Sequence, residues 1–384
     1  MKKIIFADFM EYNDPCNKLG NYHYARCFSR NGYEVLWMSC LYNKLMYFKH
    51  KDVYQERVRI STPKRHKFEE NIYGFAVKSN RLYGKYPFCK SKNIVLNNQK
   101  YISKDIDTWF NKIGFLEVDI LWISNPKQYW LTNIIKYKTL VFRIPDDFTE
   151  FGVFPDSIVD IENSLIDKAD IICVTAKNLM KKVEARGKEA ILLPNGCELS
   201  HFMNGDDSIP EEYLNDHSKK AIYVGAIGEW FDTDLIDRLA KEVNINIYII
   251  GKEQKDLSKI KENVNVKVLG AKPYSEITKY IKNADVAIIP FINNDFTDRI
   301  NPIKLFEYLA CGIPVVSTNM KEVRRLNSPA YVAKDGEDFI NEIKNIIKLN
   351  KSNKNDYINF ASKNSWDARY DFIINLIDSL SKDK

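Results

Sequence analysis

The stretch from 299 to 318, RINPIKLFEYLACGIPVVST, constrains the fold of this chain more than any other. Asn301 suits the N-cap of a helix, and Pro302 suits the first helical position, where a missing N–H costs nothing. Gly312 stands where such a helix needs a residue in the left-handed conformation, and the proline two positions later prevents its continuation. The Val-Val pair that follows begins a short buried strand. This order of loop, helix, glycine turn and strand is typical of the edge of a nucleotide site in a parallel α/β sheet.

Two charged residues, Lys304 and Glu307, lie within this otherwise apolar helix. They are three positions apart and therefore share one face. Lys304 falls in the first turn, where backbone N–H groups also attract anions, so both would hold a phosphate placed there. Glu307, one turn later, can accept hydrogen bonds from ribose hydroxyls. Taken alone, the two residues are more simply explained as a surface pair that stabilises the helix by about 0.2–0.5 kcal/mol. The whole stretch favours the binding site.

The whole stretch resembles the donor-site signature of GT-B glycosyltransferases, especially the family-four type (glycosyl transferases group 1), which builds bacterial cell-surface polysaccharides. By this resemblance Glu307 binds the nucleotide ribose, residues 312–316 form the Gly-x-Pro-Val-Val turn, and Asn301 and Lys304 belong to the donor site. The family often has a second Glu eight residues before the first, contacting the sugar, but this chain has Arg299 there. An arginine in that place suits an acidic sugar or the diphosphate.

Predicted strands and helices alternate along nearly the whole chain, which indicates an α/β fold. Residues 191–202, ILLPNGCELSHF, resemble the Pro-Asn-Gly stretch that joins the two GT-B domains. We therefore expect a GT-B fold: two facing, Rossmann-like, doubly wound domains with an interdomain cleft. The acceptor-binding domain would cover residues 1–196, completed by a C-terminal helix at 365–384. The nucleotide-sugar donor domain would cover residues 197–364.

The expected donor domain opens with AIYVGAIGEWFD, in which a buried strand runs into Gly225 and Gly228. Glycines at such a turn let the backbone approach a diphosphate. The family usually places an Arg and a Lys directly after this turn, whereas this chain has Glu-Trp-Phe-Asp. More of the positive charge for the phosphates is therefore expected from Lys304. Further along, the loop of Lys272 and Tyr274 corresponds to the family's loop that receives the base through backbone groups.

In the acceptor domain, the resemblance places Gly20, Asn21 and His23 in a loop on the acceptor side of the cleft. For His23, a capping or packing role explains the residue at least as well. The sequence IPDD puts Asp146 and Asp147 at the carboxyl end of a buried strand, where ligands bind in parallel sheets. One of them is expected to act as a general base or to orient the acceptor hydroxyl. The alternative is that Asp147 caps a turn and Asp146 is solvated.

Positive charge is concentrated in the first hundred residues, which hold 19 Lys and Arg against 8 Asp and Glu. Residues 43–68 contain eight of these cations, with the apolar run Leu45 to Phe48 among them. Such a composition is typical of an element on an anionic membrane surface, although a solvated insertion explains it about as well. No helix here presents a clean face of base-reading side chains, so we do not expect nucleic acid as a partner.

Several other classes of protein are not supported by the sequence. The opening MKKIIFADFM is no secretory signal because Asp8 interrupts its apolar run, and no apolar run is long enough to span a bilayer. The seven cysteines form no CxxC pair and read as reduced thiols. We therefore expect a cytoplasmic protein, peripheral at the inner face of the cell membrane. No DxD motif predicts a metal, and no GxGxxG predicts a Rossmann oxidoreductase.

These patterns favour a hexosyltransferase that moves a sugar from a nucleotide donor, expected to be UDP-linked, to a glycan or lipid-linked acceptor in cell-surface polysaccharide synthesis. No cofactor or metal is expected, because protein cations beside the leaving diphosphate can stabilise its charge. Retention at the anomeric carbon is what the resemblance implies, while inversion with Asp146 as the base stays open. A GT-B sugar-nucleotide epimerase is the alternative that would use the same donor site.

Overall fold

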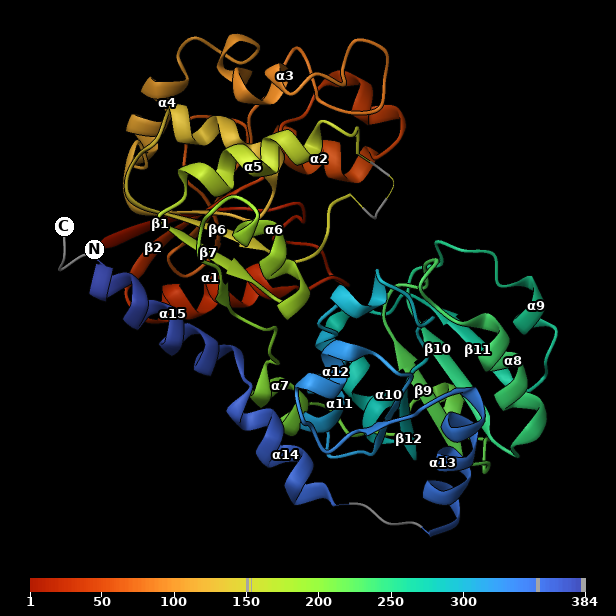
Figure 1. Ribbon diagram of the computed structural model, residues 1–384. Coiled ribbons are helices and arrows are strands. Elements are labelled where there is room, and N and C mark those ends of the chain that lie inside the picture. Colours follow the sequence, from red (N-terminus) through yellow and green to blue (C-terminus); the bar gives the residue numbers. More distant parts are fainter. Residues whose placement is uncertain (150–151, 153, 350–352, 381–384) are drawn as a thin grey trace. The chain divides into compact units, whose positions relative to one another are not determined.

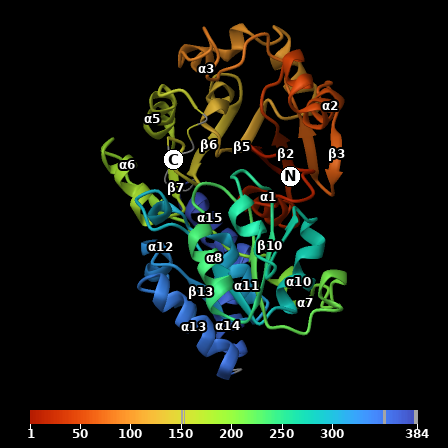
Figure 2. The ribbon, with the colours of Figure 1, turned by 90° about the vertical axis from the view of Figure 1, so that its right-hand side faces the viewer.

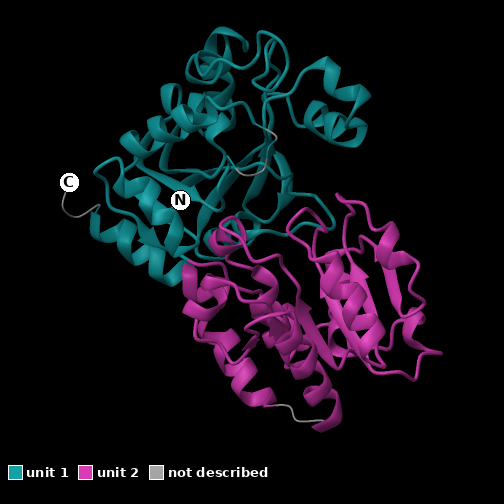
Figure 3. Ribbon diagram, turned by 45° about the vertical axis from the view of Figure 1, so that its right-hand side comes forward, with its two compact units in different colours: residues 1–193, 370–384 teal, residues 194–369 magenta. Residues whose placement is uncertain are grey.

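The computed structural model describes residues 1–149, 152, 154–349 and 353–380, and the chain divides into two compact units (Figure 1, Figure 3). Unit 1 consists of Met1–Leu193 together with Tyr370–Lys384, and unit 2 of Pro194–Arg369. The first division thus follows Leu193, where we expected residue 196. The second falls inside the last helix, at Tyr370, where we expected residue 365.

Among its described residues, unit 1 contains an eight-stranded sheet with the order β3-β4-β2-β1-β5-β6-β7-β8. In this described sheet, β3 and β4 pair in the antiparallel sense and the other neighbours are parallel. Without the edge strands β3 and β8, the order is that of a doubly wound fold, and the direction of winding reverses between β1 and β5. The strands are β1 Lys2–Ala7, β2 Tyr33–Met38, β3 His66–Glu69, β4 Ile72–Phe75, β5 Glu117–Ile123, β6 Lys136–Ile144, β7 Ile171–Val174 and β8 Ile191–Leu192.

The helices of unit 1 occupy the crossovers between these strands, as parallel pairing requires. They are α1 Gly20–Arg30, α2 Lys51–Arg59, α3 Asn93–Leu96, α4 Ile106–Ile113, α5 Ile158–Lys168 and α6 Met180–Glu184. Short 3₁₀ turns supplement them: η1 Lys44–Phe48, η2 Asn98–Lys100, η3 Pro126–Asn133 and η4 Lys177–Leu179.

The two faces of the unit 1 sheet are covered by different helices (Figure 1, Figure 2). Side chains alternate along a strand, so Ile5 and Ala7 of β1 point to one face and Phe6 to the other. The first face packs with α4 and α5 in one core. On the second face, the ring of Phe6 lies 5.7 Å from Phe28 of α1, and Phe28 lies 4.9 Å from Tyr370. Helix α15 spans Trp366–Leu380. Its part from Tyr370 onward therefore belongs to the core of unit 1.

Unit 2 contains, within the part of the chain that is described, a six-stranded parallel sheet with the order β11-β10-β9-β12-β13-β14. This is again a doubly wound order, and its winding reverses between β9 and β12. The strands are β9 Lys220–Val224, β10 Asn246–Ile250, β11 Val266–Gly270, β12 Val286–Ile289, β13 Val315–Ser317 and β14 Tyr331–Val332.

The unit 2 sheet packs against its helices in a second core. The helices are α7 Leu199–Asn204, α8 Thr233–Glu242, α9 Ser258–Lys261, α10 Ile277–Lys282, α11 Ile303–Ala310, α12 Lys321–Arg325, α13 Gly336–Leu349 and α14 Lys354–Lys363, with 3₁₀ turns η5 Glu211–Tyr213, η6 Tyr274–Glu276 and η7 Thr297–Arg299. The predicted α/β class with two doubly wound halves is confirmed.

Candidate functional site

The candidate donor site lies in unit 2 where β9 ends, next to the point at which the winding of the sheet reverses. Gly225 follows β9 with φ +147°, a conformation that side-chain-bearing residues rarely adopt. A Cβ atom on Gly225 would lie 3.0 Å from Cε and 3.3 Å from Nζ of Lys304. The glycine therefore lets the lysine amine lie directly against the backbone of the turn.

Aromatic rings from the two central strands fix the position of the Lys304 amine. Its Nζ lies 5.2 Å from the ring centre of Tyr223 on β9 and 4.7 Å from that of Phe291, which follows β12. Ring faces carry negative charge and attract cations. The ligand-binding edge of a doubly wound sheet is where its winding reverses, and Lys304 is held at that edge.

Glu307 lies one turn further along α11 and is nearly buried, with 8% of its surface exposed. Burial raises the pKa of Glu307 to about 7, and the carboxylate of Glu198 adds to the rise while the Lys304 ammonium opposes it. The pair is therefore not the exposed surface pair that local sequence alone allowed. A buried carboxyl of this kind gains most from a ligand whose hydroxyl groups donate hydrogen bonds to it.

Helix α11 is anchored to the end of β9 through Tyr308, a fully buried residue. The Val224 N–H donates to the Tyr308 hydroxyl over 2.7 Å, and that hydroxyl lies 3.3 Å from the Val224 carbonyl oxygen. The local sequence pattern gives no signal for a role of this hydroxyl. Its hydroxyl ties the helix that carries Lys304 and Glu307 to the turn at Gly225.

The predicted start of α11 is wrong. The helix begins at Ile303, and its N-cap is Pro302, which has no side chain that can cap. Asn301 instead accepts a hydrogen bond from the Asn195 N–H over 2.9 Å and donates to Glu322 over 3.0 Å. The side chain of Asn301 thus fastens the loop before α11 to the start of unit 2 and to α12.

The other predicted donor residues have more varied surroundings. The indole of Trp230 occupies the space that a Cβ on Gly228 would need. Packing against Trp230 therefore also accounts for a glycine at this position, beside the expected approach to a diphosphate. Lys272 forms a 2.8 Å ion pair with Glu212, and Tyr274 stacks on His201 with ring centres 4.4 Å apart. The Lys272 and Tyr274 side chains therefore contact residues other than Lys304 and Glu307.

Arg299 is the last residue of η7, which is the turn before α11. It is partly exposed, and its backbone N–H bonds the Phe296 carbonyl. The prediction that Arg299 contacts the donor stays a prediction.

In unit 1 the two aspartates after β6 differ in their surroundings. Asp147 is buried and accepts bonds from the backbone and hydroxyl of Thr149 at 3.2 and 2.7 Å. It also pairs with Lys182 at 2.9 Å, while Lys182 pairs with the buried Glu162 at 2.7 Å. Although burial alone would raise it, the bonds from Thr149 and Lys182 lower the pKa of Asp147. Asp146 is partly exposed at the edge of the sheet.

The predicted acceptor-side loop is a helix in the structure. Gly20, Asn21 and His23 all lie in the first turn of α1, whose N-cap Leu19 offers no side-chain bond. His23 is buried, and its Nε2 lies 3.1 Å from the Lys18 carbonyl oxygen, which agrees with the capping or packing explanation. Asn21 donates to the buried Asp8 carboxylate over 2.9 Å.

Two properties of the described residues bear on the chemistry. Over the described residues, no three or more His, Cys, Asp or Glu side chains are grouped so that they could bind a metal. Across that same part of the chain, none of the helices combines the length and the apolar character needed to cross a bilayer.

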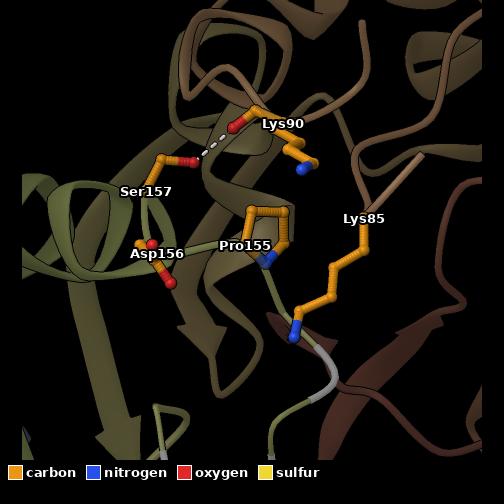
Figure 4. A pocket seen from close by; sticks show the side chains of 5 residues that line it. All are labelled: Lys85, Lys90, Pro155, Asp156 and Ser157. Carbon is orange, nitrogen blue, oxygen red and sulfur yellow. Dashed lines mark hydrogen bonds between the residues drawn. The ribbon is translucent and has the colours of Figure 1, made fainter. Parts of the chain in front are cut away.

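A surface pocket of about 420 Å³ lies in unit 1 (Figure 4). It is lined by Lys85, Lys90, Pro155, Asp156 and Ser157. The Ser157 hydroxyl donates to the Lys90 carbonyl oxygen and joins its two sides.

The fold is of the GT-B class, and the chain shares it with several solved structures. Sucrose-phosphate synthase from Thermosynechococcus elongatus superposes with a TM-score of 0.69 at 12% identity and covers 100% of both chains. Anabaena HepE, solved in complex with UDP and glucose, has a TM-score of 0.68 at 12% identity and covers 99% of this chain and 100% of its own. The lipopolysaccharide outer core galactosyltransferase WaaB has a TM-score of 0.59 at 16% identity, covering 97% and 99%.

The sequence matches agree with the fold. Residues 219–348 match the family described as glycosyl transferases group 1. The chain thus has the GT-B fold, and its residues 219–348 are similar to the group 1 glycosyl transferases. A Bacillus subtilis (strain 168) protein, TuaH, named as a glycosyltransferase of teichuronic acid biosynthesis, is 24% identical over 229 residues. The match covers 56% of this chain and 58% of that relative's length.

Proposed function

We propose that this protein transfers a hexose from a UDP-sugar to a glycan or lipid-linked acceptor in the synthesis of a cell-surface polysaccharide. In this reaction the bond between the anomeric carbon and the diphosphate breaks, and a bond to an acceptor hydroxyl oxygen forms. The hydroxyl proton passes to a base, and UDP leaves. The relatives support this direction: one is named for polysaccharide synthesis, and HepE was solved with UDP and glucose.

The observation that carries the proposal is the position of Lys304 against Gly225, with the buried Glu307 one turn along the same helix. Lys304 and the backbone of the Gly225 turn would bind the diphosphate and stabilise the charge that develops on it as it leaves. Glu307 would accept the hydroxyl hydrogens of the ribose. Arg299 would add charge near the diphosphate or an acidic sugar. We propose that no metal or other cofactor is required, since these cations supply the charge.

The catalytic group of unit 1 is assigned to Asp146. It is partly exposed at the carboxyl edge of the sheet, where ligands bind. Asp147 bonds Thr149 and Lys182, so its role is to stabilise the turn after β6. Asp146 would act as a base towards the acceptor hydroxyl or orient that hydroxyl.

Calorimetry with UDP and UDP-glucose tests the donor site. Lys304→Met should weaken UDP binding by at least tenfold, because it removes a charged bond worth about 1.5–3 kcal/mol. Lys259→Met is the matched control, since Lys259 lies on the surface and pairs with Asp234. Equal binding by wild type and Lys304→Met would contradict the site. Formation of a free epimeric sugar nucleotide, with no transfer to an acceptor, would contradict the proposed reaction.

A patch of exposed apolar and aromatic side chains in unit 1 supports a membrane-bound acceptor. We call it the apolar patch, and it consists of Leu45, Tyr47, Phe48, Tyr86 and Phe88, which are between 42% and 87% exposed. Its two segments are joined by Lys49, whose Nζ donates to the Tyr86 hydroxyl over 2.8 Å and lies 5.1 Å from the ring centre. Exposed apolar side chains among lysines fit an anionic lipid surface.

Not all of the basic residues at 43–68 are available to contact a membrane. Arg57 is buried against Glu11 at 2.6 Å. Arg65 bonds the Ile113 carbonyl and Glu34 and so supports the sheet. The membrane contact is therefore assigned to the apolar patch and its lysines. The corresponding location would be cytoplasmic, peripheral at the inner face of the cell membrane.

A further inference from the structure

The carboxyl edge of the unit 1 sheet has its own point of reversal, between β1 and β5. In doubly wound sheets, ligands bind outside the carboxyl ends of the strands at this point. Two residues mark the place in this chain. Phe9 follows the end of β1, and Lys127 follows the end of β5. Neither residue was singled out by its sequence pattern.

The Lys127 side chain lies among aromatic rings at this edge. Its Nζ is 5.6 Å from the ring centre of Phe9 and 5.2 Å from that of Phe154. The ring of Phe9 is 5.3 Å from Phe148 and 5.8 Å from Phe154, so the three rings form one cluster. Phe9, Phe154 and Lys127 are all partly exposed residues.

Within the described residues, no oxygen accepts a hydrogen bond from Lys127 Nζ and no acid pairs with it. Burial lowers the pKa of Lys127, the Arg57 guanidinium lowers it further, and the Cys40 thiol opposes them. Arg57 has its own counter-ion, Glu11, at 2.6 Å.

The nearby acid of β1, Asp8, is also engaged elsewhere. Its carboxylate accepts bonds from Asn21 at 2.9 Å and from the Phe9 N–H at 2.6 Å. Burial raises the pKa of Asp8, and these bonds and the Arg143 guanidinium oppose the rise. A partly desolvated ammonium without a counter-ion is costly, and an anion bound beside it offsets this cost.

Unit 2 provides an internal comparison. There, Lys304 lies over Tyr223 and Phe291 at the corresponding reversal between β9 and β12. Each unit therefore holds one lysine amine over aromatic rings at its ligand-binding edge. In unit 2 we assigned this amine to the diphosphate of the donor.

We propose that Lys127 binds an oxyanion carried by the acceptor, either a phosphate ester or a carboxylate, while the rings of Phe9, Phe148 and Phe154 contact the carbon skeleton next to it. This inference rests on the proposed function, because it names the chemical class of acceptor. The acceptor would thus be an anionic molecule, such as a phosphate-linked lipid or a chain ending in an acidic sugar.

Binding of small probes tests the site without knowledge of the acceptor. Hexyl phosphate, hexanoate and the neutral hexanol would be titrated into the full-length protein by calorimetry. We expect saturable binding of at least one anion and at least tenfold weaker binding of hexanol. Lys127→Met should lose at least tenfold in anion affinity, and Lys127→Arg should keep most of it. Lys138→Met, at an exposed lysine of the same unit, should bind as the wild type does.

The results distinguish a phosphate-linked acceptor from an acidic sugar. They also distinguish failure of the anion site at Lys127 from failure of the donor site. Preference for hexyl phosphate would indicate a phosphate-linked acceptor, and preference for hexanoate an acidic sugar. Failure of the wild type to bind either anion, equal affinity for hexanol, or unchanged anion binding by Lys127→Met would overturn the site. UDP binding measured on the same variants should not change. A wild type that binds hexyl phosphate but not UDP would contradict the donor site and leave the anion site supported.

Discussion

At the scale of single residues, the ionisation of Glu307 is the property most open to measurement. Its pKa is raised to about 7 by burial. The ionised form is the one that accepts two hydroxyl hydrogens, so UDP-sugar affinity should rise with pH through this range. If only the ionised form binds, affinity should increase by about tenfold between pH 6 and pH 8.

The control for this pH dependence is Glu307→Gln, which cannot ionise. Its affinity for the UDP-sugar should be lower at pH 8 and nearly flat with pH. A UDP-sugar is preferred to UDP because both of its phosphates are esterified and keep their charge over this range. A wild-type profile that is as flat as that of Glu307→Gln would remove Glu307 from the site.

Substitutions of the two aspartates after β6 should have different effects, one on turnover and the other on thermal stability. Asp146→Asn should lower turnover by on the order of 10²–10⁴-fold with UDP-sugar binding intact, because a base or orienting carboxylate is lost. Asp147→Asn should mainly lower the melting temperature, because it breaks the bond to Lys182. Kinetics and thermal unfolding on both variants distinguish these effects. The reverse pattern would move the catalytic role to Asp147.

The residues predicted correctly share a local signal. Gly312 was expected to end α11 in the left-handed conformation, and its φ is +76°. Lys304 and Glu307 stood out because two charges interrupt an apolar helix. By contrast, the bond between Asn195 and Asn301 joins residues 106 positions apart, and no local pattern announces it. The same holds for Lys182 and Asp147, which are 35 positions apart.

At the scale of elements, the apolar patch gives a direct prediction. Substituting both Phe48 and Phe88 by Ser should weaken binding to anionic vesicles by at least tenfold, because burying a phenylalanine contributes about 1.5–3 kcal/mol. Phe372→Ser, at an exposed ring of α15 outside the patch, is the matched control. Vesicle sedimentation at low and high salt measures both the apolar and the electrostatic contribution to binding, since the lysine contribution is screened by salt. Equal sedimentation of wild type and double variant would exclude the patch.

Element boundaries were predictable only where the sequence carries a start or stop signal. The short buried strand expected from the Val-Val pair is β13, Val315–Ser317. Helix α1 begins at Gly20 with no capping side chain at Leu19, so its first turn was taken for a loop. At α11 the opposite happened: Asn301 is a good cap by type, but its side chain is used by Asn195 and Glu322. Tertiary bonds overrode the local preference there.

At the scale of the whole molecule, ligand protection should be confined largely to one unit. A molecule that binds only the folded protein stabilises the part that it contacts. Hydrogen exchange with and without UDP should therefore show the strongest added protection around Gly225 and at residues 302–312. Protection centred on the unit 1 sheet would contradict the assignment of the donor site to unit 2.

The course of the chain through α15 has a consequence for rearranging this protein. Unit 1 is discontinuous: residues up to Leu193 need Tyr370 and the rest of α15 to complete their core, as the contact between Phe28 and Tyr370 shows. Unit 2 is a single uninterrupted segment between them. In genetic terms unit 2, the proposed donor-binding unit, is a cassette inserted into unit 1. An exchange of donor specificity between such proteins would need two junctions, one near Leu193 and one inside α15, whereas a single crossover would leave a chimaera whose first half packs against a foreign helix.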